Sequence, residues 1–247
     1  MIPKTIHYCW FGRGEKPELA IKCIESWRKY LPDYVIKEWN EDTFDVSQNQ
    51  YVHEAYVNRK YAFVTDYVRL YALYVEGGIY MDTDVEVLRN YNNFLEHNAF
   101  SGFESDGNVP TGMMAAEKGS IWAKELLEQY DTRRFVQEDG SFDLTTNTTV
   151  ITKYMVSKGL LLNNKLQDFP GLCTMYPSDY FCPKDHGTGK ITCTKNTVCI
   201  HHFAGSWIEH SILKSCRHKI KLFLSKIFGR RIIVALSDIV TLRIFKR

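Results

Sequence analysis

The chain has 247 residues, of which 45% are hydrophobic and 24% charged, and its formal net charge is +2. This composition excludes a largely disordered chain, and the length is enough for one large α/β domain or two small ones. No apolar stretch reaches 18 residues and the start, MIPKTIHYCWFG, does not follow the signal-peptide pattern, so we expect neither a membrane-spanning helix nor a secreted protein.

The first 40 residues predict a strand, a helix and a second strand. Residues 6–11 form a strand-like run that ends at Gly12 and Gly14. Residues 17–32 carry apolar side chains at helical spacing and end at a proline, and residues 34–40 are typical of a strand. This order indicates a parallel βαβ unit.

A long helix and a further strand follow. Val64, Val68, Tyr71 and Val75 recur at helical spacing until Gly77 stops the pattern. The next run, GIYMDTDVEVL, predicts a strand with two aspartates at or just past its end. Further strands are predicted at AFSGFE, TGMMAAE and NTVCIHHFAG, and further helices at IWAKELLEQY and TNTTVITKYMVSKG. Alternating elements favour an α/β fold, whose ligands bind beyond the carboxyl ends of the strands.

The seven cysteines are odd in number and include no C-x-x-C pair. A structural zinc site or a complete disulfide framework is therefore not expected. Reduced thiols fit better, and they indicate a cytoplasmic protein.

Asp82 and Asp84 form the pair of aspartates in GGIYMDTDVEV. Removing an unpaired carboxylate from water is costly, so a cation, a proton or hydrogen bonds must face these groups. Oxygen ligands suit hard ions such as Mg²⁺ or Mn²⁺, usually shared with phosphate oxygens of a substrate. We therefore expect residues 82–84 to turn onto a ligand at the end of the strand.

Three segments together resemble the D-x-D sugar-binding glycosyltransferases of family 32: IPKTIHYCWFG, TDYVRLYALYVEGGIYMDTDVEVL and HHFAGSW. These are GT-A-fold enzymes related to yeast mannosyltransferases, bacterial capsule and polysaccharide transferases and the clostridial glucosylating toxins. The resemblance implies a GT-A-like domain over residues 1–210, with an open, mixed, mainly parallel sheet flanked by helices. Residues 211–247 would form a separate C-terminal tail.

The resemblance implies a nucleotide-sugar donor, with a UDP-sugar favoured, whose diphosphate is bridged by a divalent ion. By that match Asp84 is the direct metal ligand, and Asp82 serves the metal or the donor ribose. A late histidine commonly completes the metal shell in these enzymes, and the pattern His-Phe-x-Gly fits His202 better than His201, for which a packed or surface position is the favoured interpretation. An imidazole ligand favours Mn²⁺ over Mg²⁺.

The resemblance also assigns residues to the donor. Ser206 and Trp207 would donate to its phosphate oxygens, and Trp10 would stack on the base. Asp66 and Arg69, three residues apart on one helical face, match the S/T-D-x-x-R pattern that holds the donor sugar's hydroxyls. A simple ion pair for Asp66 and Arg69, and core packing for the tryptophans, are the alternatives.

The expected reaction is transfer of a hexose from a nucleotide diphosphate sugar to a glycan or lipid-linked glycan acceptor in polysaccharide biosynthesis. Retention of configuration follows from the resemblance, and Asn147 is a further candidate for a donor or acceptor contact. One alternative is a phosphatase of the haloacid dehalogenase type, which would use the first aspartate as nucleophile but should show a Gly-Thr soon after the pair. The other is a non-catalytic carbohydrate- or nucleotide-binding module with the same fold.

The C-terminal tail is strongly basic. Residues 211–247 hold ten Lys or Arg and one acid, Asp238, a net charge of +9 that leaves −7 for the remainder. In HKIKLFLSKIFGRR, five apolar residues recur at helical spacing among basic ones, as in helices that lie on anionic membranes. We expect the protein at the inner face of the cell membrane, with no nucleic-acid partner; packing of the tail on the catalytic domain is the alternative.

Overall fold

The computed structural model describes residues 1–104, 107–109 and 112–205. Ser206, Trp207 and the tail lie outside the described residues, so the roles expected for them stay predictions. Within the described ranges, none of the helices has the length and apolar character needed to cross a bilayer.

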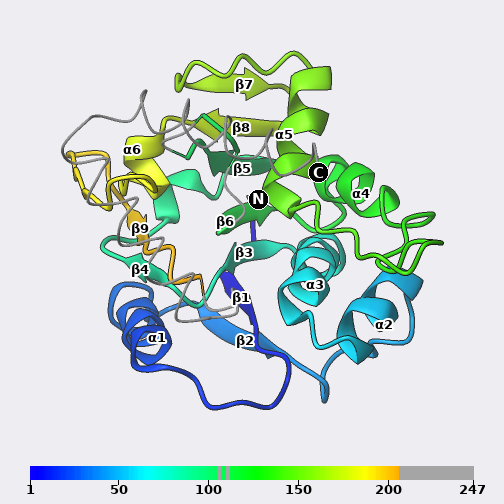
Figure 1. The fold of residues 1–247 in the computed structure, drawn as a ribbon. Coiled ribbons are helices and arrows are strands. Elements are labelled where there is room, and N and C mark those ends of the chain that lie inside the picture. The colour runs from blue at the N-terminus through cyan, green and yellow to red at the C-terminus, as the bar shows by residue number, and fades with distance from the viewer. Residues whose placement is uncertain (105–106, 110–111, 206–247) are drawn as a thin grey trace.

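One mixed sheet of seven short strands lies at the centre of the described residues (Figure 1). In chain order its strands are β1 (Thr5–Cys9), β2 (Val35–Trp39), β3 (Gly78–Met81), β5 (Ala99–Gly102), β6 (Met113–Ala116), β7 (Gln167–Phe169) and β8 (Cys173–Tyr176).

The order across this sheet is β2-β1-β3-β6-β5-β8-β7. β1 pairs in parallel with β2 and β3, and β5 pairs in parallel with β8. β6 is antiparallel to both of its neighbours, and β7 is antiparallel to β8. All strands except β6 and β7 therefore run in one direction, which confirms the expected open, mixed, mainly parallel sheet.

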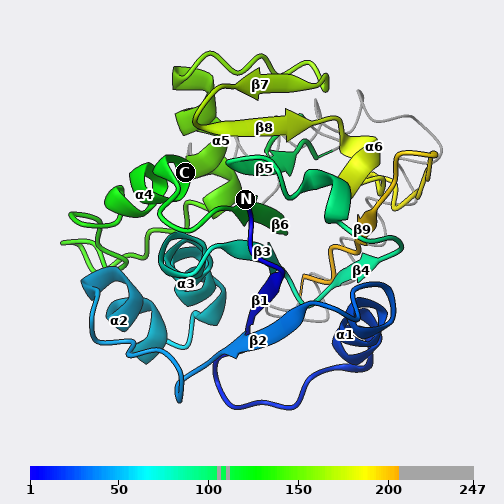
Figure 2. The ribbon, with the colours of Figure 1, turned by 180° about the vertical axis from the view of Figure 1, so that it is seen from behind.

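Helices cover both faces of the sheet. They are α1 (Glu18–Tyr30), α2 (Gln50–Val57), α3 (Tyr61–Val75), α4 (Ile121–Glu128), α5 (Asn147–Ser157) and α6 (Ser178–Phe181), with a short 3₁₀ turn, η1 (Asn92–Phe94). Figures 1 and 2 show α2, α3, α4 and α5 on one face, and α1 and α6 on the other.

The alternation of β3 explains why two separate cores form. Tyr80 packs into the core under α2 to α5, whereas Ile79 and Met81 pack into the core on the α1 side. Successive strand residues point to opposite faces, so an apolar run such as GIYM supplies both cores at once. β3 is therefore apolar at every position because it is a central strand that is buried on both faces.

The passage from α3 into β3 depends on two glycines. Gly77 and Gly78 have φ of 69° and 117°, values that side-chain-bearing residues rarely adopt. A Cβ on Gly78 would lie 2.5 Å from the carbonyl oxygen of Thr5, so the close pairing of β3 with β1 also needs glycine here. This turn carries the chain directly from the helix of Asp66 and Arg69 to the strand that ends at Asp82.

Two further strands, β4 (Val85–Val87) and β9 (Cys199–His201), form a small antiparallel ribbon outside the main sheet. Val85 pairs with His201, across more than 100 residues of sequence. The ribbon brings the late histidines to the aspartates.

The sequence predicted most of these elements. The N-terminal βαβ unit, α3, β3, β5, β6, α4, α5 and β9 are confirmed. The short elements α2, η1, β7, β8 and α6 were not predicted.

Candidate metal and donor site

Asp82 and Asp84 lie in a turn at the carboxyl end of β3. The N–H of Asp82 donates to the carbonyl of Gly112 at 2.7 Å, and the N–H of Val85 donates to the carbonyl of Asp82 at 3.0 Å. The turn lets both carboxylates leave the sheet before the chain enters β4. The expected position of the pair, at the edge where α/β folds bind ligands, is therefore confirmed.

Asp84 faces a histidine and a backbone amide. Its Oδ1 lies 3.4 Å from Nε2 of His201, and its Oδ2 accepts a 2.7 Å hydrogen bond from the N–H of Ala204. Burial by itself would raise the pKa of Asp84, but the positive imidazole and the hydrogen bonds outweigh it and lower this pKa to about 2. Burial opposes the charge on His201 as well, yet Asp84 raises the pKa of His201 well above its usual value. Asp84 and His201 therefore each favour the charged form of the other.

Asp82, Asp84 and His201 fit a divalent cation. One ligand atom from each lies within 4.8 Å of the others, and no other group of three or more such side chains occurs among the described residues. Neighbouring ligands of a six-coordinate ion with bonds of about 2.1 Å lie roughly 3 Å apart, and opposite ones roughly 4 Å apart. Two carboxylates and an imidazole suit Mn²⁺ or Mg²⁺, and the nitrogen ligand favours Mn²⁺.

The structure brings His201 to the aspartates in the place expected for His202. His201 is the last residue of β9 and pairs with Val85, so its side chain lies on the same face of the ribbon as the buried Val85. His202 follows directly, and its side chain points to the opposite face. There Nε2 of His202 lies 2.8 Å from Oε2 of Glu86. The register of the β4–β9 ribbon decides between two adjacent histidines that the His-Phe-x-Gly pattern separates by a single residue.

Asp66 and Arg69 lie on the other side of the aspartate turn, buried at 9% and 4% exposure. Nη2 of Arg69 lies 3.3 Å from Oδ1 of Asp66 and also 3.3 Å from Oδ1 of Asp82. The hydroxyl of Tyr80 donates to the same Asp82 oxygen at 2.7 Å, and the guanidinium carbon of Arg69 lies 4.6 Å from the Tyr80 ring centroid. The ion pair that the sequence offered as the alternative is present, and it extends to Asp82, while the expected contact with the donor sugar stays a prediction.

Asn147, the first residue of α5, completes this network. Its backbone N–H donates to Oδ2 of Asp66 at 3.3 Å, and its side-chain amide donates to the Asp66 carbonyl at 3.1 Å. Burial dominates here and raises the pKa of Asp66 to about 6, although Arg69 and the Asn147 amide act in the opposite direction. Oδ1 of Asn147 is fully buried and has no hydrogen-bond partner among the described residues.

Trp10 is half-buried just beyond the end of β1. Its indole N–H donates to the carbonyl of Gly14 at 2.6 Å, and Nζ of Lys16 lies 5.6 Å from its ring. The ring is thus attached to the glycine-bearing loop at the carboxyl edge of the sheet. Its expected stacking on a base stays a prediction.

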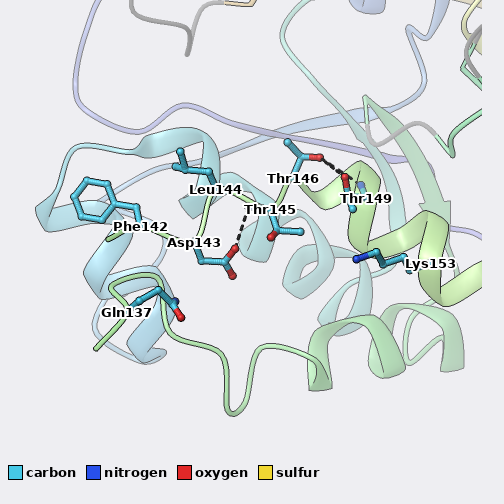
Figure 3. A pocket seen from close by; sticks show the side chains of 8 residues that line it. All are labelled: Gln137, Phe142, Asp143, Leu144, Thr145, Thr146, Thr149 and Lys153. Carbon is cyan, nitrogen blue, oxygen red and sulfur yellow. Dashed lines mark hydrogen bonds between the residues drawn. The ribbon is translucent and has the colours of Figure 1, made fainter. Parts of the chain in front are cut away.

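A separate groove of about 740 Å³ runs along the loop that leads into α5 (Figure 3). Neither aspartate of the pair lines it, so we do not assign it to the donor diphosphate. Thr146 and Thr149 on its wall flank Asn147, so the groove borders the Asp66 network. Its lining residues are Gln137, Phe142, Asp143, Leu144, Thr145, Thr146, Thr149 and Lys153.

Two residues of the site were missed in the sequence. Tyr80 could have been found, because residues two apart on a strand share a face and Tyr80 stands two before Asp82. Glu104, whose Oε1 lies 4.0 Å from Nδ1 of His201, carries no comparable signal. It is one polar residue after an apolar strand.

Comparison with known proteins agrees with this geometry. Residues 17–101 match the family described as "Glycosyltransferase sugar-binding region containing DXD motif", a stretch that includes Asp66, Arg69 and both aspartates of the pair. An uncharacterized glycosyltransferase of Acanthamoeba polyphaga mimivirus is 27% identical over 232 residues, which are 88% of this chain and 87% of that protein. Inositol phosphoceramide mannosyltransferase 3 of Schizosaccharomyces pombe is 30% identical over 130 residues, 51% of this chain and 36% of that protein.

Among solved structures, the PaToxG glycosyltransferase is similar with a TM-score of 0.47 and 20% identity, over 64% of this chain and 69% of that one. A glycosyltransferase involved in glycosylation of the major capsid of PBCV-1 gives a TM-score of 0.44 and 11% identity, over 87% of this chain and 98% of that one.

The matched stretch runs from just before α1 to β5, so it includes β3 and the aspartate turn of the open, mixed sheet. Residues 17–101 thus match the DXD sugar-binding region of glycosyltransferases, the class of enzyme that the resemblance to family 32 implied. In this stretch the D-x-D motif is Asp82-Thr83-Asp84.

Proposed function

We propose that the protein is a glycosyltransferase that transfers a hexose from a nucleoside diphosphate sugar, with a UDP-sugar as first choice, to a glycan or lipid-linked glycan acceptor. The observation that carries the proposal is the double role of Asp82. It belongs to the cluster of ligands with Asp84 and His201, and its Oδ1 also contacts Arg69 and Tyr80. A candidate cation site and a buried hydrogen-bonding network therefore share one carboxylate.

Asp82, Asp84 and His201 would hold a divalent cation, with Mn²⁺ as first choice. When bound, such an ion neutralises the charge that develops on a departing diphosphate. The hydrogen bond from Ala204 and the contact with His201 fix the orientation of Asp84 before any substrate arrives. Tyr80 and Arg69 fix Asp82 in the same way.

Asp66 and Arg69 would bind the hexose hydroxyls, the carboxylate as acceptor and the guanidinium as donor. Their burial supports this role, because hydrogen bonds in a site shielded from water discriminate strongly between hydroxyl positions. The name of the fission-yeast relative, a mannosyltransferase, supports a hexose donor.

Transfer with retention is part of the proposal. Asp66 is engaged by Arg69 and Asn147, which argues against a role as the enzyme's nucleophile. We therefore propose a front-face reaction: the bond from the anomeric carbon to the phosphate oxygen breaks, a bond to the acceptor oxygen forms on the same face, and the acceptor proton passes to the departing phosphate.

A donor panel tests the function. Thermal unfolding is followed with Mn²⁺ and each nucleotide sugar in turn, since a ligand that binds the native state stabilises it in proportion to the logarithm of its excess. We expect a rise in Tm with one donor and Mn²⁺ together, and no rise with that donor in Asp84→Asn. Absence of any Mn²⁺-dependent rise across the panel would contradict the proposed donor class.

We further propose a role in polysaccharide biosynthesis at the inner face of the cell membrane, supported by the basic, amphipathic sequence of residues 211–247. The intact chain should co-sediment with anionic liposomes in low salt and dissociate in high salt. A chain that ends at Ser211 should stay in solution and keep its donor hydrolysis or transfer. Equal sedimentation of the two chains would remove the membrane from the proposal.

A further inference from the structure

The imidazole of His201 lies between two carboxylates. Nε2 is 3.4 Å from Oδ1 of Asp84, and Nδ1 is 4.0 Å from Oε1 of Glu104. The side chains of His201 and Glu104 are 13% and 12% exposed. Nδ1 is fully buried without a hydrogen-bond partner at close range, and the Glu104 carboxylate and the thiol of Cys182 both lie near the ring.

Two neighbours restrict rotation of this imidazole. A Cβ on Gly112 would lie 2.9 Å from Cε1 and from Nδ1 of His201, so the backbone of Gly112 lies directly against the ring. The ring of Phe203, a residue with φ of 53°, has its centroid 4.1 Å from that of His201. The ring has little room to turn, so each nitrogen keeps the carboxylate that it faces.

Glu104 is fixed by its own backbone, independently of the aspartate turn. It follows the end of β5, where the N–H of Phe103 donates to the carbonyl of Tyr176 at 2.9 Å. The N–H of Glu104 donates to the carbonyl of Asn108 at 2.7 Å, and its carbonyl accepts from Gly107 at 3.0 Å. The carboxylate is therefore presented to His201 from a separate element.

We propose that Glu104 is a positioning residue for His201: its carboxylate accepts a hydrogen bond from Nδ1–H and so leaves the lone pair of Nε2 directed at the cation. This inference rests on the proposed metal-dependent function. A metal-binding histidine commonly donates its other ring N–H to a carboxylate, which fixes the tautomer and strengthens the ligand. The 4.0 Å between Nδ1 and Oε1 exceeds hydrogen-bond distance, and a small movement of the Glu104 side chain would close it.

Without the Glu104 carboxylate, the buried Nδ1–H would lose its nearest charged acceptor, at the cost of an unsatisfied polar group. The competing tautomer, with the proton on Nε2, would direct a hydrogen at the cation position. Both effects weaken metal binding without removing a metal ligand.

The matched control is Glu86, which makes a similar carboxylate–histidine pair with His202 at 2.8 Å but lies outside the ligand cluster. Binding of Mn²⁺ alone is measured from the electron paramagnetic resonance signal of the free ion. Glu104→Ala should raise the Kd for Mn²⁺ about 10- to 100-fold. Glu104→Gln, whose amide oxygen still accepts, should raise it less, and Glu86→Gln should leave it close to the wild-type value.

A second readout reports the tautomer itself. Nuclear magnetic resonance of ¹⁵N-histidine protein with excess Mg²⁺ distinguishes the two ring nitrogens, and the His201 signals are those lost in His201→Gln. The wild type should carry the proton on Nδ1, and Glu104→Ala should show a mixture of tautomers. Thermal unfolding of each metal-free variant confirms that it is folded, and Glu104→Gln supplies the test if Glu104→Ala does not fold.

The outcomes separate this inference from the proposed function. If Glu104→Ala and Glu104→Gln bind Mn²⁺ as the wild type does while Asp84→Asn does not, the metal centre stands and the role of Glu104 is wrong. If Asp84→Asn binds Mn²⁺ as the wild type does, the metal centre itself is wrong, and the role of Glu104 is lost with it.

Discussion

Asp66 and Asp84 are two carboxylates withdrawn from water, each beside a cationic side chain, yet their pKa values move in opposite directions. That of Asp84 falls to about 2, and that of Asp66 rises to about 6. Asp84 faces His201 and accepts a backbone hydrogen bond from Ala204, and together these interactions lower its pKa by more than burial raises it. Asp66 shares Arg69 with Asp82, a second negative charge, so burial prevails.

Burial raises the pKa of both carboxylates, and the charges and hydrogen bonds around each one decide whether its pKa ends above or below the usual value. Around the β4–β9 ribbon, the protein holds Asp84 ionised at any physiological pH, ready for a cation. Around α3 and α5, it holds a carboxylate that becomes charged only near neutrality. Changes to each region in turn test this contrast.

Asp84→Ala should have the largest effect. Loss of the ligand removes several kcal/mol of stabilisation of the departing diphosphate, so transfer should fall by about 10³-fold or more. Mn²⁺-dependent nucleotide binding should disappear, while circular dichroism stays that of the wild type. Full wild-type turnover in excess EDTA would exclude the metal assignment.

The two adjacent histidines give the sharpest comparison within the ribbon. His201→Ala should raise the Mn²⁺ concentration needed for half-maximal transfer by about 10-fold or more, because a metal ligand is lost. His202→Ala, which removes only the contact with Glu86, should change it little. The reverse order would restore His202, the histidine that the sequence pattern favours.

Asp66→Asn and Arg69→Lys test the second region. Each should lower kcat/KM for the donor about 10²-fold, since a buried hydrogen-bonding partner of the sugar is lost or displaced. Affinity for the free nucleoside diphosphate, measured by calorimetry, should change much less. Equal losses of transfer and of diphosphate affinity would reduce the pair to a structural role.

The pH dependence of transfer should carry the signature of Asp66. Its carboxylate has to be charged to pair with Arg69 and accept from the sugar, so kcat/KM should rise with pH through about 6. Asp66→Asn should be slow but lack this limb of the profile. A profile of unchanged shape in the variant would assign the limb to another group.

The smallest expected effect is on the stability of the metal-free protein. The folded-state pKa of Asp66 is raised, so the folded protein binds the proton more tightly and the contribution of this group to stability is lost as pH rises from about 4 to 6. Asp84 has the opposite sign: its contribution is present above about pH 4 and lost as pH falls toward 2.

Between pH 4 and 6, the Tm of the wild type should therefore fall relative to that of Asp66→Asn by a few degrees, from a free energy on the order of 2 kcal/mol. Scanning calorimetry of both proteins in EDTA measures the difference. A constant difference across this range would mean that Asp66 is not raised by burial.

The sequence predicted those parts of the site that lie within one element. Asp66 and Arg69 share a face because a helix places residues three apart together, and Asp82 follows a strand end because a glycine turn and an apolar run precede it. Such spacings are set by the local geometry of the backbone.

The contacts between elements were not accessible in this way. Arg69 reaches Asp82 across the α3–β3 turn, Asn147 reaches Asp66 from α5, and Glu104 reaches His201 from the end of β5. Each depends on how two elements pack, and no spacing in the sequence encodes that packing.

By itself, the sequence determined the class of fold, the D-x-D motif at a strand end and the Asp66–Arg69 pair. Only the tertiary structure decided which histidine joins the aspartates, because a shift of one residue in the pairing of β4 with β9 would exchange the faces of His201 and His202. It also decided that the pKa values of Asp66 and Asp84 move in opposite directions. Burial and the sharing of one cation by two carboxylates arise only when distant segments pack together.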